Sequence, residues 1–108
     1  MWRIDVLRKI NIVKERIVRE YRPQQIILFG SYAYGHPVEE SDVDVLIIMQ
    51  FKGKAAFKAI EILEKVKPPF PIDLIVRTPQ QVKTRIAQND FFMREVLKKG
   101  KVLYATPH

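Results

Sequence analysis

The stretch that decides the fold is residues 26–49, IILFGSYAYGHPVEESDVDVLIIM. The four apolar residues 26–29 are enough for a buried strand, and Gly30 after them permits a sharp turn and a close backbone approach by a ligand. Ser31 is a favourable N-cap residue, so a short helix is expected to begin there. The apolar run 45–49 predicts a second strand. The stretch therefore predicts a strand, a glycine turn that opens a short helix, a loop, and a second strand.

Two aspartates stand at the mouth of the second predicted strand. Asp42 and Asp44 are two residues apart, so both side chains leave the same face of an extended chain. The glycine turn offers backbone amides to a phosphate group. Two carboxylates repel a polyphosphate, but they can hold it through Mg²⁺, which binds carboxylate and phosphate oxygens together. These residues predict a phosphate site built around magnesium.

The same residues resemble the signature of the nucleotidyltransferases of the DNA polymerase beta superfamily, in which Gly-Ser and a second glycine precede Ser-Asp-x-Asp and an apolar strand. The matching residues are Gly30, Ser31, Gly35, Ser41, Asp42 and Asp44. The length of 108 residues makes the chain similar to the minimal nucleotidyltransferase subfamily. Many members carry Arg just before the second glycine, where this chain has Tyr34.

The resemblance also implies a third carboxylate, on the strand beside the Asp-x-Asp pair. Asp73 is the only acid within the apolar segment 70–76, where an unpaired carboxylate is costly to bury. The catalytic and metal-binding residues implied by the resemblance are Asp42, Asp44 and Asp73, which would hold two Mg²⁺ ions. The nucleotide-binding residues that it implies are Gly30, Ser31 and Gly35.

The activity implied by the resemblance is transfer of a nucleoside monophosphate, AMP from ATP, onto a hydroxyl group. A chain of this length has little room for a second substrate pocket, so another molecule is expected to present the hydroxyl. In the resembled subfamily, small members are commonly antitoxins that transfer AMP to a tyrosine of a HEPN-type toxin. An enzyme of this kind, with that partner, is the leading interpretation.

Three alternatives stay open. The chain could be a transferase acting on a small hydroxylated compound such as an aminoglycoside, although relatives with that activity are usually larger. It could be a non-catalytic nucleotide- or partner-binding module, an interpretation that depends on Tyr34. It could also bind nucleic acid or modify RNA ends, because seven basic residues lie in the first 22.

The rest of the sequence predicts a mixed α/β fold, with a sheet of about three to five strands covered by helices, in a single domain over residues 1–108. Periodicity and capping signals predict helices over 3–21, 54–66, 79–87 and from 89 or 90 to 99, and strands over 70–76 and 101–105. The expected buried stripe of the second long helix is Ala56, Ala59, Ile60, Leu63 and Val66. The expected apolar face of the last helix is Phe91, Phe92, Val96 and Leu97.

Composition sets the remaining expectations. The net charge is +7, yet residues 24–50 contain no Lys or Arg, which suits a metal at an acidic centre and an anionic ligand arriving from outside. The absence of cysteine fits a reducing compartment. No signal peptide and no apolar run of membrane-spanning length are present, so a cytoplasmic location is expected. His36, Glu39 and Glu40 are expected to be exposed loop residues.

Overall fold

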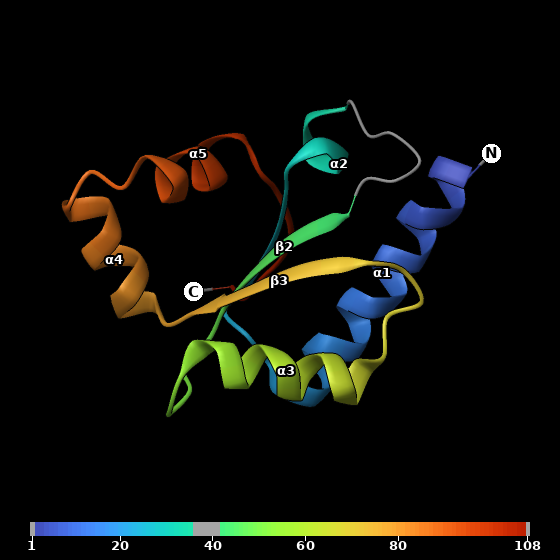
Figure 1. The fold of residues 1–108 in the computed structure, drawn as a ribbon, viewed down its shortest axis with the longest axis horizontal. Coiled ribbons are helices and arrows are strands. Elements are labelled where there is room, and N and C mark those ends of the chain that lie inside the picture. The colour runs from blue at the N-terminus through green and yellow to red at the C-terminus, as the bar shows by residue number, and fades with distance from the viewer. Residues whose placement is uncertain (1, 36–41, 108) are drawn as a thin grey trace.

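The computed structural model describes residues 2–35 and 42–107, which form five helices and four strands (Figure 1). The helices are α1 (Trp2–Tyr21), α2 (Ser31–Tyr34), α3 (Ala55–Val66), α4 (Pro79–Ala87) and α5 (Phe91–Lys99). The strands are β1 (Gln25–Phe29), β2 (Val43–Ile48), β3 (Ile72–Arg77) and β4 (Lys101–Ala105). The expectations for His36, Glu39, Glu40 and Ser41 concern residues outside the described ranges.

The strands form one mixed sheet in the order β3-β2-β1-β4. β1 is antiparallel to both β2 and β4, whereas β2 and β3 are parallel. Parallel neighbours need a crossover connection, and α3 provides it here. The predicted mixed sheet with packed helices is confirmed.

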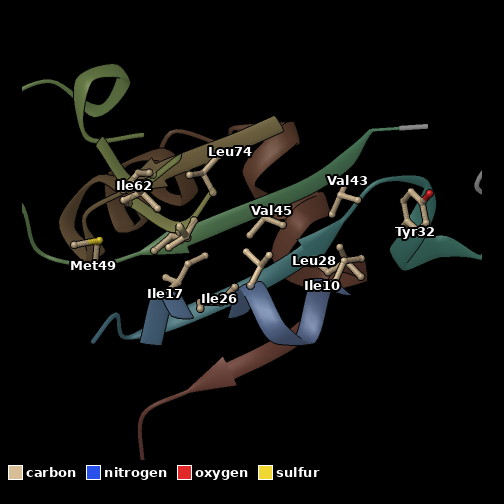
Figure 2. Packing of buried hydrophobic residues seen from close by; sticks show 14 of the residues in the cluster. Ile10, Ile17, Ile26, Leu28, Tyr32, Val43, Val45, Met49, Ile62 and Leu74 are labelled. Carbon is tan, nitrogen blue, oxygen red and sulfur yellow. The ribbon is translucent and has the colours of Figure 1, made fainter. Parts of the chain in front are cut away.

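The two central strands, β1 and β2, are buried on both faces of the sheet, which is why they read as nearly continuous apolar runs. Alternate residues of β1 and β2 point to opposite faces. One face packs with α1 and α3 around a cluster that includes Ile10, Ile17, Ile26, Val45 and Ile62 (Figure 2). The other face packs with α4 and α5 around Phe29, Leu46, Ile48, Val82 and Met93. Asp44 of β2 and Asp73 of β3 lie at one end of this second face.

Most predicted element boundaries agree with the structure within two residues. Thr78 caps α4: its hydroxyl accepts from the Gln81 amide at 3.1 Å, and the Gln81 side chain accepts from the Thr78 amide at 2.9 Å. Asp90 is the cap of α5, since its carboxylate accepts from the Met93 amide at 2.9 Å.

Two strand predictions need correction. β2 begins at Val43 rather than 45, so Asp44 lies inside the strand and only Asp42 precedes it. β3 spans Ile72–Arg77 rather than 70–76. The carbonyl of Pro71 still accepts from the Val43 amide at 3.0 Å, so strand pairing starts just as the proline-rich segment ends.

The predicted helix faces were partly wrong. In α3 the fully buried isoleucine is Ile62, whereas Ile60 is 52% exposed. In α5 the buried residues are Met93 and Val96, whereas Phe91 and Phe92 are exposed. Helical spacing finds an apolar stripe, but the rotation of the helix against the sheet decides which of its residues are covered.

None of the helices in residues 2–35 and 42–107 is both long and apolar enough to cross a lipid bilayer.

Candidate active site at the glycine turn and the β2–β3 carboxylates

The glycine turn connects β1 to α2. Gly30 has φ 74° and ψ −158°, a conformation that is open almost only to glycine. Its carbonyl accepts from the amides of Ala33 and Tyr34, each at 3.0 Å, which closes the first turn of the short helix. Gly35 ends that helix with φ 89°, and its amide donates to the carbonyl of Ser31 at 3.0 Å.

The expectation that Ser31 caps the short helix was wrong. Gly30 occupies the N-cap position and Ser31 is the first helical residue, with no side-chain capping hydrogen bond at this end. The chain turns into the helix through the backbone conformation of Gly30, without a side-chain cap. The Ser31 hydroxyl is therefore not committed to a cap.

Gly30 is needed for a second reason, which is contact with Asp44. A Cβ atom built on Gly30 would overlap the Asp44 carboxylate. The sequence indicated that a glycine here permits a close approach, and the structure shows that the Asp44 side chain itself makes such an approach. The turn and the carboxylate therefore form one packed unit.

Asp44 and Asp73 lie side by side on neighbouring strands. They are register partners in the parallel pair of β2 and β3, and Phe29 is the partner of Asp44 on β1. Neighbouring strands lie about 4.8 Å apart, and register partners share a face of the sheet. Two residues far apart in the sequence are thus brought together at one end of the sheet.

The carboxylates influence one another electrostatically. Burial raises the pKa of Asp44, and the negative charges of Asp73 and then Asp42 raise it further. Asp44 is half-buried, while Asp42 and Asp73 are exposed. The structure therefore brings Asp44 and Asp73 together, and Asp42 lies near enough for its charge to act on Asp44.

The donor set suits a hard divalent cation. Within the described residues, no three Asp, Glu, His or Cys side chains form a group that could hold a metal ion unaided. Magnesium is usually bound by one or two carboxylates together with substrate phosphates, rather than by an all-protein cage. The unfavourable negative charge at Asp44, expressed in its raised pKa, is what a bound cation would offset.

Phe92 of α5 lies beside Phe29, at the end of the sheet that carries Asp44. The Phe92 ring meets the Phe29 ring edge-on, with centroids 5.5 Å apart and an interplanar angle of 84°. Phe92 is nevertheless exposed, and Phe29 is the register partner of Asp44. The sequence predicted that Phe92 lies on the buried face of this helix. It could not predict the exposed position, because nothing in the local sequence shows which end of the sheet α5 covers.

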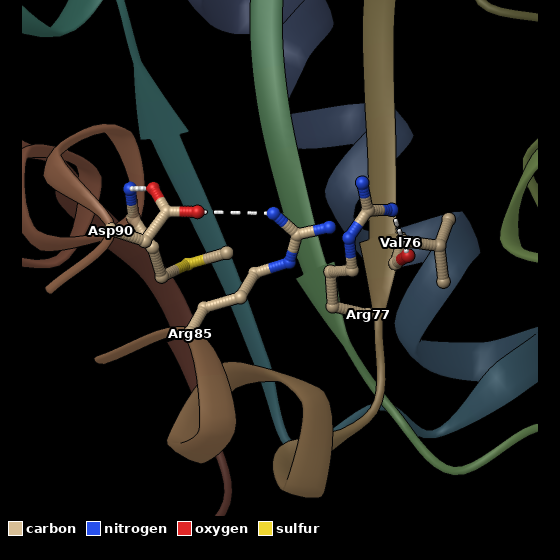
Figure 3. Close-up of polar contacts among 5 residues, drawn as sticks. Val76, Arg77, Arg85 and Asp90 are labelled. Carbon is tan, nitrogen blue, oxygen red and sulfur yellow. Dashed lines mark hydrogen bonds and ion pairs between the residues drawn. The ribbon is translucent and has the colours of Figure 1, made fainter. Parts of the chain in front are cut away.

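A second polar cluster lies on the same face, near the opposite end of β3 (Figure 3). Arg85 donates to the Asp90 carboxylate at 3.0 Å, and Arg77 donates to the carbonyl of Val76 at 2.8 Å. Burial lowers the pKa of Arg77 and the nearby charge of Arg85 lowers it further, while the charge of Asp90 partly opposes both effects. Neither arginine stands out in the sequence, because their proximity depends on how α4 folds back beside β3.

The family model of the nucleotidyltransferase domain matches residues 10–104. The chain belongs to this family. Two Methanocaldococcus jannaschii proteins are similar in sequence and carry the names "Putative protein adenylyltransferase MJ0604" and "Putative protein adenylyltransferase MJ1379". The first is 41% identical over 86 residues, covering 77% of this chain and 80% of the relative. The second is 36% identical over 78 residues, covering 68% and 73%. The chain is accordingly a nucleotidyltransferase.

Solved structures share the fold of this nucleotidyltransferase. A putative nucleotidyltransferase from Sulfolobus solfataricus has a TM-score of 0.68 at 20% identity, covering 95% of this chain and 83% of that one. A mutant of the toxin–antitoxin MntA–HpeT gives 0.53 at 21% identity, and a toxin–antitoxin with AMP-PNP gives 0.50 at 20% identity. Each of these two matches covers 91% of this chain and 73% of the other.

Proposed function

We propose that this nucleotidyltransferase is a magnesium-dependent adenylyltransferase that moves AMP from ATP onto a tyrosine hydroxyl of a partner protein. We propose further that the partner is a HEPN-type toxin, that the chain acts as its antitoxin, and that both work in the cytoplasm. The observation that carries the proposal is the pairing of Asp44 with Asp73 in register, with Asp44 packed against Gly30.

The residues of the site form two groups with different tasks in this proposal. Asp42, Asp44 and Asp73 would hold two Mg²⁺ ions, which when bound neutralise the phosphates and lower the pKa of the attacking hydroxyl. Gly30, Ser31 and Gly35 bind and orient the triphosphate at the turn. The hydroxyl gives its proton to the Asp73 carboxylate and its oxygen forms a bond to the α-phosphorus. The bond from that phosphorus to the bridging oxygen of the β-phosphate breaks, and pyrophosphate leaves.

The position of Asp73 suits the acceptor side of the reaction. It is exposed and lies on an edge strand, whereas Asp44 is half-buried beside the glycine turn. The triphosphate would thus lie toward Gly30 and the incoming hydroxyl toward β3. This division places the acceptor at an open side of the molecule, where a protein can reach it.

The relatives support the choice of acceptor and partner. Both curated relatives are named as protein adenylyltransferases, so the transferred group and a protein acceptor come from those names. Two of the structural neighbours are toxin–antitoxin proteins, one of them with the ATP analogue AMP-PNP. The HEPN type of the toxin comes from the resemblance to the minimal nucleotidyltransferases.

The test follows a radioactive label from ATP onto the protein whose gene adjoins that of this chain. With Mg²⁺, label at the α-phosphate should appear on that protein, and label at the γ-phosphate should not. Asp44→Asn should reduce the transfer by about 100-fold or more, because the charge arrangement supplies most of this catalysis. Partner binding without label would instead favour a non-catalytic module, and label from the γ-phosphate would contradict nucleotidyl transfer.

A further inference from the structure

β3 is an edge strand, and no other strand within the described residues pairs with its outer side. The amide of Val43 in β2 donates to the carbonyl of Pro71 at 3.0 Å. Successive residues of a strand direct their backbone groups to opposite sides, so the amides and carbonyls of Leu74 and Val76 face outward. Such an edge is a template for pairing with another chain.

A groove of about 460 Å³ runs along this edge. Its floor is β3 from Leu74 to Arg77, and its walls come from α3 and α4. The wall residues are Ala55, Ala56, Ala59, Gln81 and Arg85. The three alanines leave room beside the strand, and the same helix exposes Phe57 (67%) and Ile60 (52%) to solvent. The groove is thus narrow, partly apolar and lined by an open strand edge.

Two arginines, Arg77 and Arg85, line one end of the groove, and Figure 3 shows their guanidinium groups. Arg85 already has a carboxylate partner in Asp90. Arg77 has no carboxylate within ion-pair distance in the described part of the chain, and its guanidinium covers the outward carbonyl of Val76 instead. A half-buried arginine that has no ion-pair partner can bind a carboxylate from another molecule through a charge-assisted hydrogen bond.

The groove ends one residue along β3 from the proposed active site. Leu74, at one end of its floor, directly follows Asp73 in β3. At about 3.3 Å per residue, Arg77 lies about 13 Å from Asp73 along the strand. A segment lying in the groove would therefore extend from the cationic end to the acceptor side of the site.

From this arrangement we infer that the acceptor protein docks as an extended segment that adds a strand to the free edge of β3. Its backbone pairs with Leu74 and with the amide of Val76, whose carbonyl already accepts from Arg77. An acidic side chain of the segment binds Arg77 beside Arg85. The inference rests on the proposed protein acceptor and names the surface by which the chain would select that protein. The strand pairing supplies affinity, and the acidic side chain supplies specificity.

The first arm of the test fills the groove. Ala56→Arg places a long side chain on the groove wall at an exposed position, and Ala87→Arg makes the same change at an exposed position of α4 outside the groove. With the protein encoded by the adjacent gene as acceptor, Ala56→Arg should lower kcat/KM for the acceptor by about tenfold or more, mainly through KM. Calorimetric ATP binding with Mg²⁺ should match the wild type in both variants, and Ala87→Arg should transfer normally.

The second arm measures hydrogen exchange of single amides. Adding the same acceptor protein should slow the exchange of Leu74 and Val76, while the amides of Asp73 and Ile75, which face β2, should stay as they are. Protection that grows with the concentration of this chain alone would assign the edge to a second copy and overturn the inference.

The two proposals fail in different ways. Transfer that Ala56→Arg leaves unchanged, without protection of Leu74 and Val76, would overturn the docking mode and leave the adenylyltransferase proposal standing. Protection of these amides without any transfer in the wild type would support the docking mode and contradict the activity. Neither transfer nor protection would contradict both.

Discussion

Gly30 and Asp44 show how a single residue choice constrains the site. Gly30 has a backbone conformation that other residues reach only with strain, and the Asp44 carboxylate fills the space where a Cβ would lie. The sequence predicted the turn, since a glycine after an apolar run is a local signal. It could not predict the contact, because that contact depends on the pairing of β1 with β2.

We predict that Gly30→Ala lowers the free energy of unfolding and also disables nucleotide transfer. The backbone strain alone should cost about 1–3 kcal/mol. The displaced Asp44 carboxylate should lower the transfer rate by about 100-fold, as expected for a misplacement of about 1 Å. Urea unfolding and the transfer assay would measure the two effects.

Gly53→Ala is the matched control for that variant. Gly53 also has a positive φ, 87°, but a Cβ there would meet nothing within 4 Å. It should lose stability through strain and keep its transfer activity. Equal losses of activity in the two variants would show that the contact with Asp44 is irrelevant to the site.

At the scale of elements, the helix ends were predictable because they are encoded locally. Thr78 with Pro79, and Asp90 before the final helix, are capping signals that tertiary packing did not override. The exposed faces were less predictable. Ile60 and Ile62 are both apolar residues of α3, and only the packing against the sheet shows that Ile62 is the one buried.

The cap of α5 predicts a specific pH dependence of stability. The Met93 amide, and then the Arg85 guanidinium, hold the pKa of Asp90 below its ordinary value of 3.8. A carboxylate whose pKa is lowered by folding stabilises the fold fully above its unfolded pKa. It loses that contribution as the pH falls through its folded pKa.

Asp90→Asn isolates this contribution, because asparagine is also a good N-cap but cannot ionise. We expect the wild type to be more stable than Asp90→Asn near neutral pH. The difference should shrink as the pH falls from about 5 toward 2. Urea unfolding of both proteins across this pH range would measure it, and a difference that does not change with pH would contradict the assigned cause.

At the scale of the whole molecule, the sequence predicted a mixed sheet covered by helices, and the structure confirms it. The motif in residues 26–49 is compact enough in sequence to predict the turn and the Asp-x-Asp pair. Asp73 was inferred through a family resemblance, and its register with Asp44 appears only in the fold. The free edge of β3 and the pairing of β4 with β1 are long-range features with no local signal.

The distribution of charge over the whole molecule also bears on how ATP would bind. The chain has a net charge of +7, while Asp44 and Asp73 lie side by side at one end of the sheet, with Asp42 near enough for its charge to act on Asp44. In the proposed mechanism a cation offsets this negative charge before ATP binds, because a triphosphate and carboxylates repel one another. The central claim is therefore that these carboxylates bind ATP through magnesium.

The measurement that tests this claim most directly is a calorimetric titration of the chain with ATP, carried out with Mg²⁺ and again with EDTA. We predict binding to the wild type only when Mg²⁺ is present, and no detectable binding to an Asp44→Asn variant that retains its circular dichroism spectrum. ATP binding that is equally tight in EDTA, or equally tight in Asp44→Asn, would contradict the account.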